Sequence, residues 1–286
     1  MNKLWFKRIE EVFFRGIMLL SSGIIVLALL LIVISILYKG LPSLSLKMLI
    51  ETPKGGYYFG KEGGILNAIV GSLYLSVGST FLSFIISLPL ALYINVHQTK
   101  NGKLVNTVRF LLDLLWGIPS IVYGAFGFTI MIYFGLRTSL LAGIITVTLF
   151  IIPIMVRSMD EVFKTVNRGL LESAFSLGST KSETAYKVML RQCIPGVVTA
   201  ILLAFGRAIG DAASVLFTAG YTDYIPTSLG QPTATLPLSI FFQLSSPIAE
   251  VQNRAYASAV VLTIIILVIS IVSRLISRKY NQERIK

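Results

Sequence analysis

Two charged residues four positions apart lie deep within an apolar stretch of the sequence. Arg207 and Asp211 fall inside the run from about Ile194 to Thr218, which otherwise contains no Lys, Arg, Asp or Glu. At this spacing the two side chains would share one face of a helix. An ionised side chain in the middle of a membrane costs about 2.5–3.5 kcal/mol on insertion scales, so we expect this pair to face a bundle interior or a water-filled path.

Two kinds of chemistry suit the pair, and the residues alone leave both open. The planar guanidinium of Arg207 can donate paired hydrogen bonds to a phosphate-like oxyanion. Alternatively, Arg207 and Asp211 form a structural ion pair that locks two helices together. Gly206 and Gly210 have a small-xxx-small spacing, which favours a role in close helix packing.

Pro119 and Ser120 belong to a second apolar stretch and are candidates to line the same route. A proline inside a membrane span frees a backbone carbonyl and kinks the helix. Ordinary core packing explains these two residues equally well.

A short amphipathic segment precedes Gly178. Its apolar residues recur at helical spacing, and they are Leu170, Leu171, Ala174, Phe175 and Leu177. Gly178 then provides a stop signal for a helix. The segment is interpreted either as a helix lying on a membrane surface or as a knob that docks a partner protein, apolar on one face and anchored by Glu172.

The composition places these segments in a membrane. Only 13% of the 286 residues are charged and 55% are hydrophobic, whereas a soluble domain has about 25% charged residues. The net charge of +12 does not indicate nucleic-acid binding, because a nucleic-acid module keeps a polar exterior. A single cysteine, Cys193, and a single histidine, His97, argue against a disulfide, a cysteine-based metal site and a histidine-centred active site.

Six uncharged or nearly uncharged runs are long enough to span a bilayer. We therefore predict an all-α integral membrane protein with one six-span domain over residues 16–276. The predicted spans are residues 16–38, 66–96, 110–136, 138–157, 194–219 and 255–275. The proline-rich stretch 220–254 is predicted as an external loop with a short interfacial segment over Leu236–Leu244.

The Lys and Arg residues indicate the orientation of these spans. Eighteen of the 25 fall on the side that contains both termini, and six on the other. Such an excess marks the cytoplasmic side. We therefore expect residues 1–15, the loop 158–191 and the tail 277–286 to be cytoplasmic.

The amphipathic segment resembles a loop motif of ABC-importer permeases. Glu172-Ser173-Ala174, three residues, Gly178, nine residues and then Val188-x-Leu190 are similar to the Glu-Ala-Ala, Gly, Ile-x-Leu-Pro pattern of that family. Ser173 replaces an alanine, and Arg191 stands where the family has proline. The resemblance implies that Glu172, Ser173, Ala174, Gly178 and Leu190 belong to a coupling segment that fits a groove on a cytoplasmic ATPase.

A second motif resembles the phosphate-importer permeases of the PstA type. The run from Gly206-Arg207 through Gly210-Asp211 to Leu216-Phe217-Thr218-Ala219 carries this similarity. Segments around Gly63–Ala68, Gly117–Gly124 and Leu229–Pro237 agree with it. Asp211 stands where the family has glutamate, Ala212 where it has threonine, and Ser214 where it has proline.

The resemblance implies a type I ABC-importer permease in a prokaryotic inner membrane, a transport subunit rather than an enzyme. It implies a PstC-like second permease, a cytoplasmic ATPase dimer and an external phosphate-binding protein as partners. This chain has no Gly-x-x-x-x-Gly-Lys-[Ser/Thr] sequence for a P-loop, so ATP and Mg would be bound by the ATPase and no cofactor by this chain. The alternatives are a permease for another oxyanion such as molybdate or sulfate, a membrane-embedded enzyme, or a structural membrane protein.

Overall fold

The computed structural model describes residues 2–54, 62–96 and 102–283, and within them all elements longer than an isolated β-bridge between Pro53 and Gly63 are helices. In chain order the helices are α1 (Asn2–Gly40), α2 (Leu46–Ile50), α3 (Leu66–Val96), α4 (Lys103–Gly117), α5 (Ser120–Tyr133), α6 (Leu140–Lys164), α7 (Arg168–Ser176), α8 (Lys181–Glu183), α9 (Leu190–Ile209), α10 (Leu236–Leu244) and α11 (Ala249–Glu283). A 3-10 turn (Leu41–Ser43) follows α1, and a π-helical turn (Thr184–Met189) joins α8 to α9. The predicted all-α class is confirmed.

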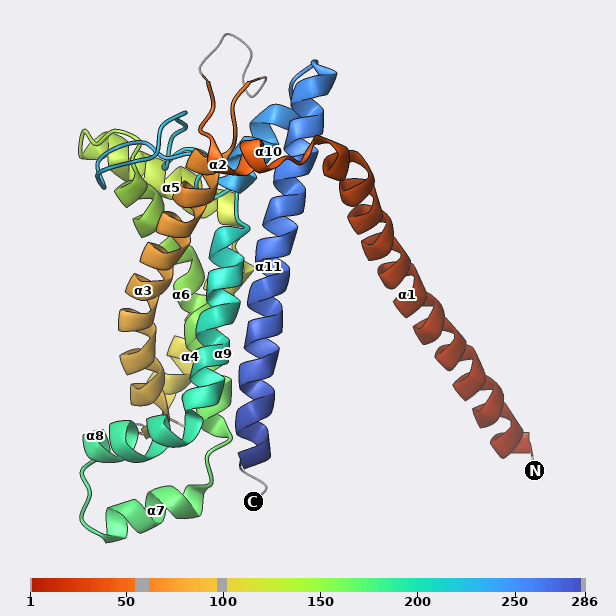
Figure 1. Cartoon of the computed structure of the whole chain (residues 1–286). Helices are drawn as coiled ribbons and strands as arrows, with labels where there is room; N and C mark the ends of the chain where they lie inside the picture. Colours follow the sequence, from red (N-terminus) through yellow and green to blue (C-terminus); the bar gives the residue numbers. More distant parts are fainter. Residues whose placement is uncertain (1, 55–61, 97–101, 284–286) are drawn as a thin grey trace.

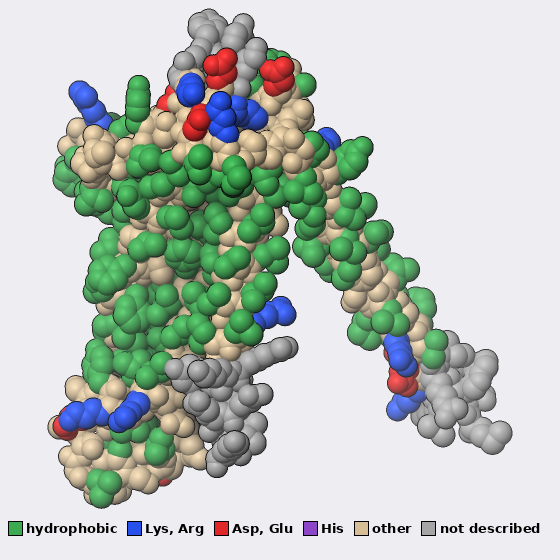
Figure 2. All heavy atoms as spheres, in the orientation of Figure 1, with side chains coloured by type: hydrophobic (Ala, Val, Ile, Leu, Met, Phe, Trp, Pro, Cys, Tyr) green, Lys and Arg blue, Asp and Glu red, His purple; other side chains and the backbone are tan. Residues whose placement is uncertain are grey.

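These helices are long and apolar enough to cross a membrane six times. α1, α3, α6, the continuous α8–α9 segment and α11 are each long and apolar enough to span, and α4 with α5 adds a sixth, bent span. α1 begins and α11 ends at the end of the molecule where α7 lies (Figure 1). Charged side chains gather toward the two ends of the molecule, with an apolar band between them (Figure 2).

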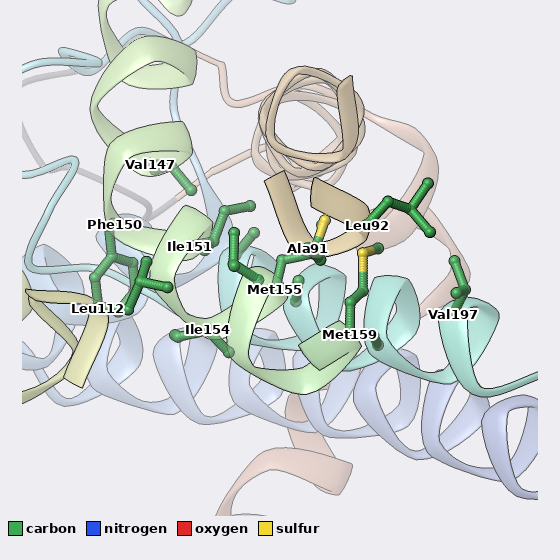
Figure 3. Packing of buried hydrophobic residues seen from close by; sticks show 14 of the residues in the cluster. Ala91, Leu92, Leu112, Val147, Phe150, Ile151, Ile154, Met155, Met159 and Val197 are labelled. Atoms are coloured by element: carbon green, nitrogen blue, oxygen red, sulfur yellow. The ribbon is translucent and has the colours of Figure 1, made fainter. Parts of the chain in front are cut away.

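The core is built around α6. A stripe at a spacing of four faces inward along this helix, as expected for a packed helical face. Its fully buried members are Val147, Ile151, Met155 and Met159. Leu92 of α3, Leu112 of α4 and Val197 of α9 pack around it (Figure 3).

Small side chains allow α3 to pack closely against α6. Four serines on one side of α3 are fully buried, namely Ser76, Ser79, Ser83 and Ser87. Thr148 of α6 donates a hydrogen bond to the carbonyl oxygen of Ser79 at 3.3 Å. Small residues at helix contacts let backbones approach in membranes, where the hydrophobic effect does not drive helix association. The α3–α6 pair is therefore a tightly packed scaffold for the other helices.

Several helix bounds differ from the predicted spans. α3 and α10 have the expected ends, but α10 packs into the bundle, because Leu236 and Leu238 are fully buried. α6 continues to Lys164, beyond residue 157, so the connection before α8 covers only residues 165–180 of the predicted loop 158–191. α1 diverges from the bundle and packs on it mainly through the start of α11 (Figure 1).

Candidate functional site

The third predicted span is interrupted near its middle. α4 ends at Gly117 and α5 begins at Ser120, and the two helices are bent by 95°. Ile118 and Pro119 between them have extended backbones, with ψ of 128° and 139°. Proline has no N–H to continue a helix and disfavours the helical conformation of the residue before it. The predicted span 110–136 therefore consists of two helices with a sharp bend between them, and not of one kinked helix.

A cavity of about 460 Å³ lies beside this break. Three segments form its wall: the junction of α4 with α5, the middle of α6 and the last turns of α9. The lining residues are Trp116, Gly117, Ile118, Pro119, Ser120, Phe150, Ile154, Leu203 and Arg207. The fold thus brings three predicted pathway residues together, Pro119, Ser120 and Arg207.

Arg207 is the charged member of this lining among the described residues. Its guanidinium carbon lies 5.1 Å from the centre of the Phe150 ring, within range of a cation–π interaction. No carboxylate in the described part of the chain forms an ion pair with Arg207. Its hydrogen-bond donors therefore remain open to an anion in the cavity.

Asp211 lies outside the helix that carries Arg207. α9 ends at Ile209, and the residues that follow are irregular before a series of turns. Asp211 is 9% exposed, and its Oδ2 accepts a hydrogen bond from the Ser214 N–H at 2.8 Å. The expected shared helix face is therefore wrong, and the alternative of an Arg207–Asp211 ion pair does not form in the described chain. Short acidic side chains readily form such local bonds to the backbone, which compete with a helix.

The two glycines beside Arg207 are not at close helix contacts within this chain. A Cβ atom at Gly206 would meet nothing within 4 Å, and at Gly210 its nearest neighbours would be at 3.5 and 3.7 Å. A close approach near this segment occurs at Gly124 of α5, where a Cβ would lie 2.8 Å from the carbonyl oxygen of Ser214. The turns after α9 are thus packed against α5.

The predicted amphipathic helix is α7, and it ends as expected. The Asn167 side chain accepts a hydrogen bond from the Gly169 N–H at 2.9 Å and caps its start. Gly178 has φ of +84°, the left-handed conformation that glycine adopts without steric cost. The Gly178 N–H donates to the carbonyl oxygen of Phe175 at 2.9 Å, which closes the helix end.

α7 has one packed side and one open side. Ala174 is buried, and α7 contacts the π-helical turn that precedes α9. Glu172 and Ser173 are exposed, and Leu177 is 87% exposed. Leu190 lies elsewhere, because it is the first residue of α9 and packs against the main core. The structure therefore groups Glu172 to Gly178 on one surface and separates Leu190 from them.

A fully buried carboxylate, Asp160, lies near the α7 end of the bundle and was not among the residues predicted from the sequence. Its partners are Arg109 (Nη2 to Oδ1, 2.8 Å; Nε to Oδ2, 3.0 Å), Asn95 (Nδ2 to Oδ1, 2.9 Å), Arg157 (Nη1 to Oδ2, 3.2 Å) and Lys164 (Nζ to Oδ2, 2.9 Å). We call these five residues the Asp160 network. Its basic members were interpreted only as topology signals, and the acidic residue within the same cluster was the available clue.

Known proteins resemble this chain in sequence over most of its length. The sequence model of the family described as binding-protein-dependent transport system inner membrane component matches residues 87–285. The phosphate transport system permease protein PstA of Yersinia pestis is 34% identical over 251 residues, which cover 87% of this chain and 83% of that protein. The probable PstA of Methanocaldococcus jannaschii is 32% identical over 245 residues, 83% of each chain.

Two solved structures share the fold. A chain of the MetNI methionine ABC transporter, in an inward-facing conformation, has a TM-score of 0.61 at 22% identity and covers 75% of this chain and 95% of its own. A chain of a bacterial alginate ABC transporter has a TM-score of 0.59 at 16% identity, with coverage of 96% and 97%. The predicted permease fold is therefore confirmed.

These findings also decide between the classes that the sequence left open. The relatives are transport components and not enzymes, and the several apolar helices agree with a multi-pass protein of the inner membrane. The chain belongs to the family of binding-protein-dependent transport system inner membrane components.

Proposed function

We propose that this chain is the permease subunit of an ATP-driven phosphate importer, with the cavity beside the α4–α5 break as part of the pathway. The observation that carries the proposal is Arg207, which lines a cavity of about 460 Å³ without an ion-pair partner in the described chain. The similarity to PstA proteins supports phosphate as the solute.

The cavity has the chemistry of an oxyanion site. The guanidinium of Arg207 can form two parallel hydrogen bonds to a tetrahedral oxyanion. Ser120 adds a hydroxyl, and it is also the first residue of α5, whose N-terminus has no side-chain cap. Uncapped N–H groups and the helix dipole favour negative charge at such a position. The Phe150 ring holds the guanidinium at the wall of the cavity.

In this proposal α7 is the coupling segment. The exposed surface around Glu172, Ser173 and Leu177 would fit a groove on a cytoplasmic ATPase, and an ATPase dimer would bind ATP and Mg. Nucleotide would bias the population of outward-open and inward-open conformations, as in any two-state switch. The α7 end is then cytoplasmic, with both chain termini, which agrees with the excess of Lys and Arg there.

A second permease is supported by the surface of α1. The most apolar part of this helix has no residue buried within the chain. Its apolar side chains extend away from the bundle (Figure 2). Lipid and a PstC-like partner permease would cover it. A phosphate-binding protein would deliver solute at the opposite end from α7.

The test is ATP hydrolysis by the reconstituted complex, with the binding protein loaded with phosphate, molybdate or sulfate. Stimulation by the phosphate-loaded protein is expected. Stimulation by the molybdate-loaded or sulfate-loaded protein alone would contradict the phosphate assignment and favour another oxyanion.

A further inference from the structure

The Asp160 network lies between α7 and the cavity. Asp160 is in the last turns of α6, and only residues 165–167 separate this helix from α7. Ile154, further back on α6, lines the cavity. We propose that Asp160 is a positioning residue that makes α4 move with α6, so that a displacement of α7 reaches the cavity. The inference rests on the coupling role proposed above for α7.

Two ionic contacts tie α4 to α6 at successive turns. Arg109 of α4 donates to both oxygens of Asp160, a bidentate contact that fixes orientation as well as distance. One turn further along α4, Asp113 forms an ion pair with Arg157, with 2.8 Å between Oδ1 and Nε. Arg157 also contacts Asp160 at 3.2 Å, which links the two ionic contacts to each other. Together they resist both sliding and rotation of α4 on α6.

α4 then connects this network directly to the cavity wall. The helix is continuous from Lys103 to Gly117 and contains no proline. Its rise of 1.5 Å per residue places Gly117 about 12 Å along the axis from Arg109. Trp116 and Gly117 line the cavity at the break. A movement imposed at Arg109 therefore shifts one wall of the cavity.

Stability alone is a poor explanation for this arrangement. Lys164 and Arg157 are on the same helix as Asp160 and already provide positive charge beside the carboxylate. Apolar residues of similar volume often stabilise a protein as much as a buried ionic group does. Arg109 and Asn95 add contacts from α4 and α3, and such contacts across helices define one relative position of the three.

The experiment measures whether nucleotide reaches the cavity. Ser120→Cys places a thiol in the cavity wall, and the chain's only native cysteine, Cys193, is buried. Maleimide labelling is followed in the full complex in proteoliposomes, without nucleotide and with ATP plus vanadate. Arg109→Gln removes the bidentate contact and leaves Asp160 with two cations. Lys187→Gln is the matched control, because it removes a 3.0 Å ion pair to Glu183 with a 74% exposed lysine side chain.

The reporter chain and the Lys187→Gln control should show a change in labelling rate with nucleotide. Arg109→Gln should reduce that change by about 2- to 30-fold, the range for mutations in coupling networks. Arg109→Lys keeps the positive charge but cannot form the bidentate contact. Its nucleotide-dependent change in labelling rate should lie between those of Arg109→Gln and the Lys187→Gln control. An equal nucleotide response in Arg109→Gln and Lys187→Gln overturns the proposal, and so does a reporter chain with no response.

The proposal can still be tested if the Arg109→Gln complex fails to assemble. In that case Arg109→Lys provides the comparison, and a full nucleotide response there overturns it. The labelling needs no transported solute. A wrong phosphate assignment would therefore change the stimulation by loaded binding protein and leave this readout intact.

Discussion

Arg207 and Asp211 are only four positions apart, but their surroundings differ. Arg207 is exposed on the cavity wall above Phe150. Asp211 is buried, and its carboxylate accepts the Ser214 N–H in the turns that follow α9. Because Gly210 and Asp211 end the helix, the two charges do not neutralise each other. Substitutions at the two positions should therefore have different effects.

Arg207→Gln should nearly abolish phosphate uptake while the complex still assembles. A hydrogen bond to a charged group contributes about 1.5–3 kcal/mol, which corresponds to a loss of about 10- to 150-fold. Uptake into proteoliposomes measures the loss, and size-exclusion chromatography checks assembly. Arg207→Lys keeps the positive charge but not the paired hydrogen-bond donors of the guanidinium, and it should retain part of the phosphate uptake. Disassembly of the Arg207→Gln complex would instead indicate a structural role for this residue.

Asp211→Ala should act on stability. It removes the acceptor for the Ser214 N–H, and the loss of a comparable cap costs about 0.5–2 kcal/mol. Asp211→Asn keeps an acceptor oxygen and should stay close to the parent protein. The thermal unfolding midpoint of the purified complex measures both variants. A loss of uptake in Asp211→Asn at unchanged stability would show that the negative charge itself is needed.

At the scale of elements, α7 depends on the conformation of the residue that ends it. Gly178 has φ of +84° and no neighbour near its missing side chain, so the backbone conformation and not space requires glycine. The exposed residues Glu172 and Leu177 precede this turn. The orientation of the α7 surface is thus set at Gly178.

Gly178→Ala should weaken ATPase attachment or coupling without preventing membrane insertion. A residue with a Cβ atom in the left-handed region costs about 1–2 kcal/mol. Gly169→Ala is the control within α7, since its Cβ would have an ordinary contact at 3.4 Å. Glu172→Gln should also reduce coupling if this carboxylate contacts the ATPase. Co-purification of the ATPase and phosphate uptake are the measurements, and unchanged uptake in all variants would contradict the docking role.

The elements differ in how far the sequence predicts them. α3 and α10 have the predicted ends, because local signals mark them, such as the Thr235 cap on the Leu238 N–H. The α4–α5 break and the end of α9 were missed, because Pro119 was expected only to kink a helix and the helix of Arg207 was expected to continue through Asp211. The Asp160 network was also missed, because its members Arg109 and Asn95 are 51 and 65 residues away from Asp160 in sequence and no local spacing relates them to it.

At the scale of the whole molecule, the distribution of charge and the path of the chain agree. Lys and Arg are concentrated in the segments at the α7 end, which include the start of α1 and the tail. The other end carries the 3-10 turn, α5 and the loop before α10 (Figure 1). Six passes with this excess predict that the α7 end is cytoplasmic. The cavity and Arg207 then lie between the two sides, where alternating access needs them.

Cysteine labelling tests this orientation. Tyr224 is 79% exposed in the loop after α9, and Lys7 is exposed near the start of α1. In intact cells an impermeant maleimide should label Tyr224→Cys and leave Lys7→Cys unlabelled, and permeabilisation should expose both. The buried Cys193 gives the background. Labelling of Lys7→Cys in intact cells would show that the orientation is the opposite one, with α7 on the side of the binding protein. That result would also contradict the coupling role of the Asp160 network.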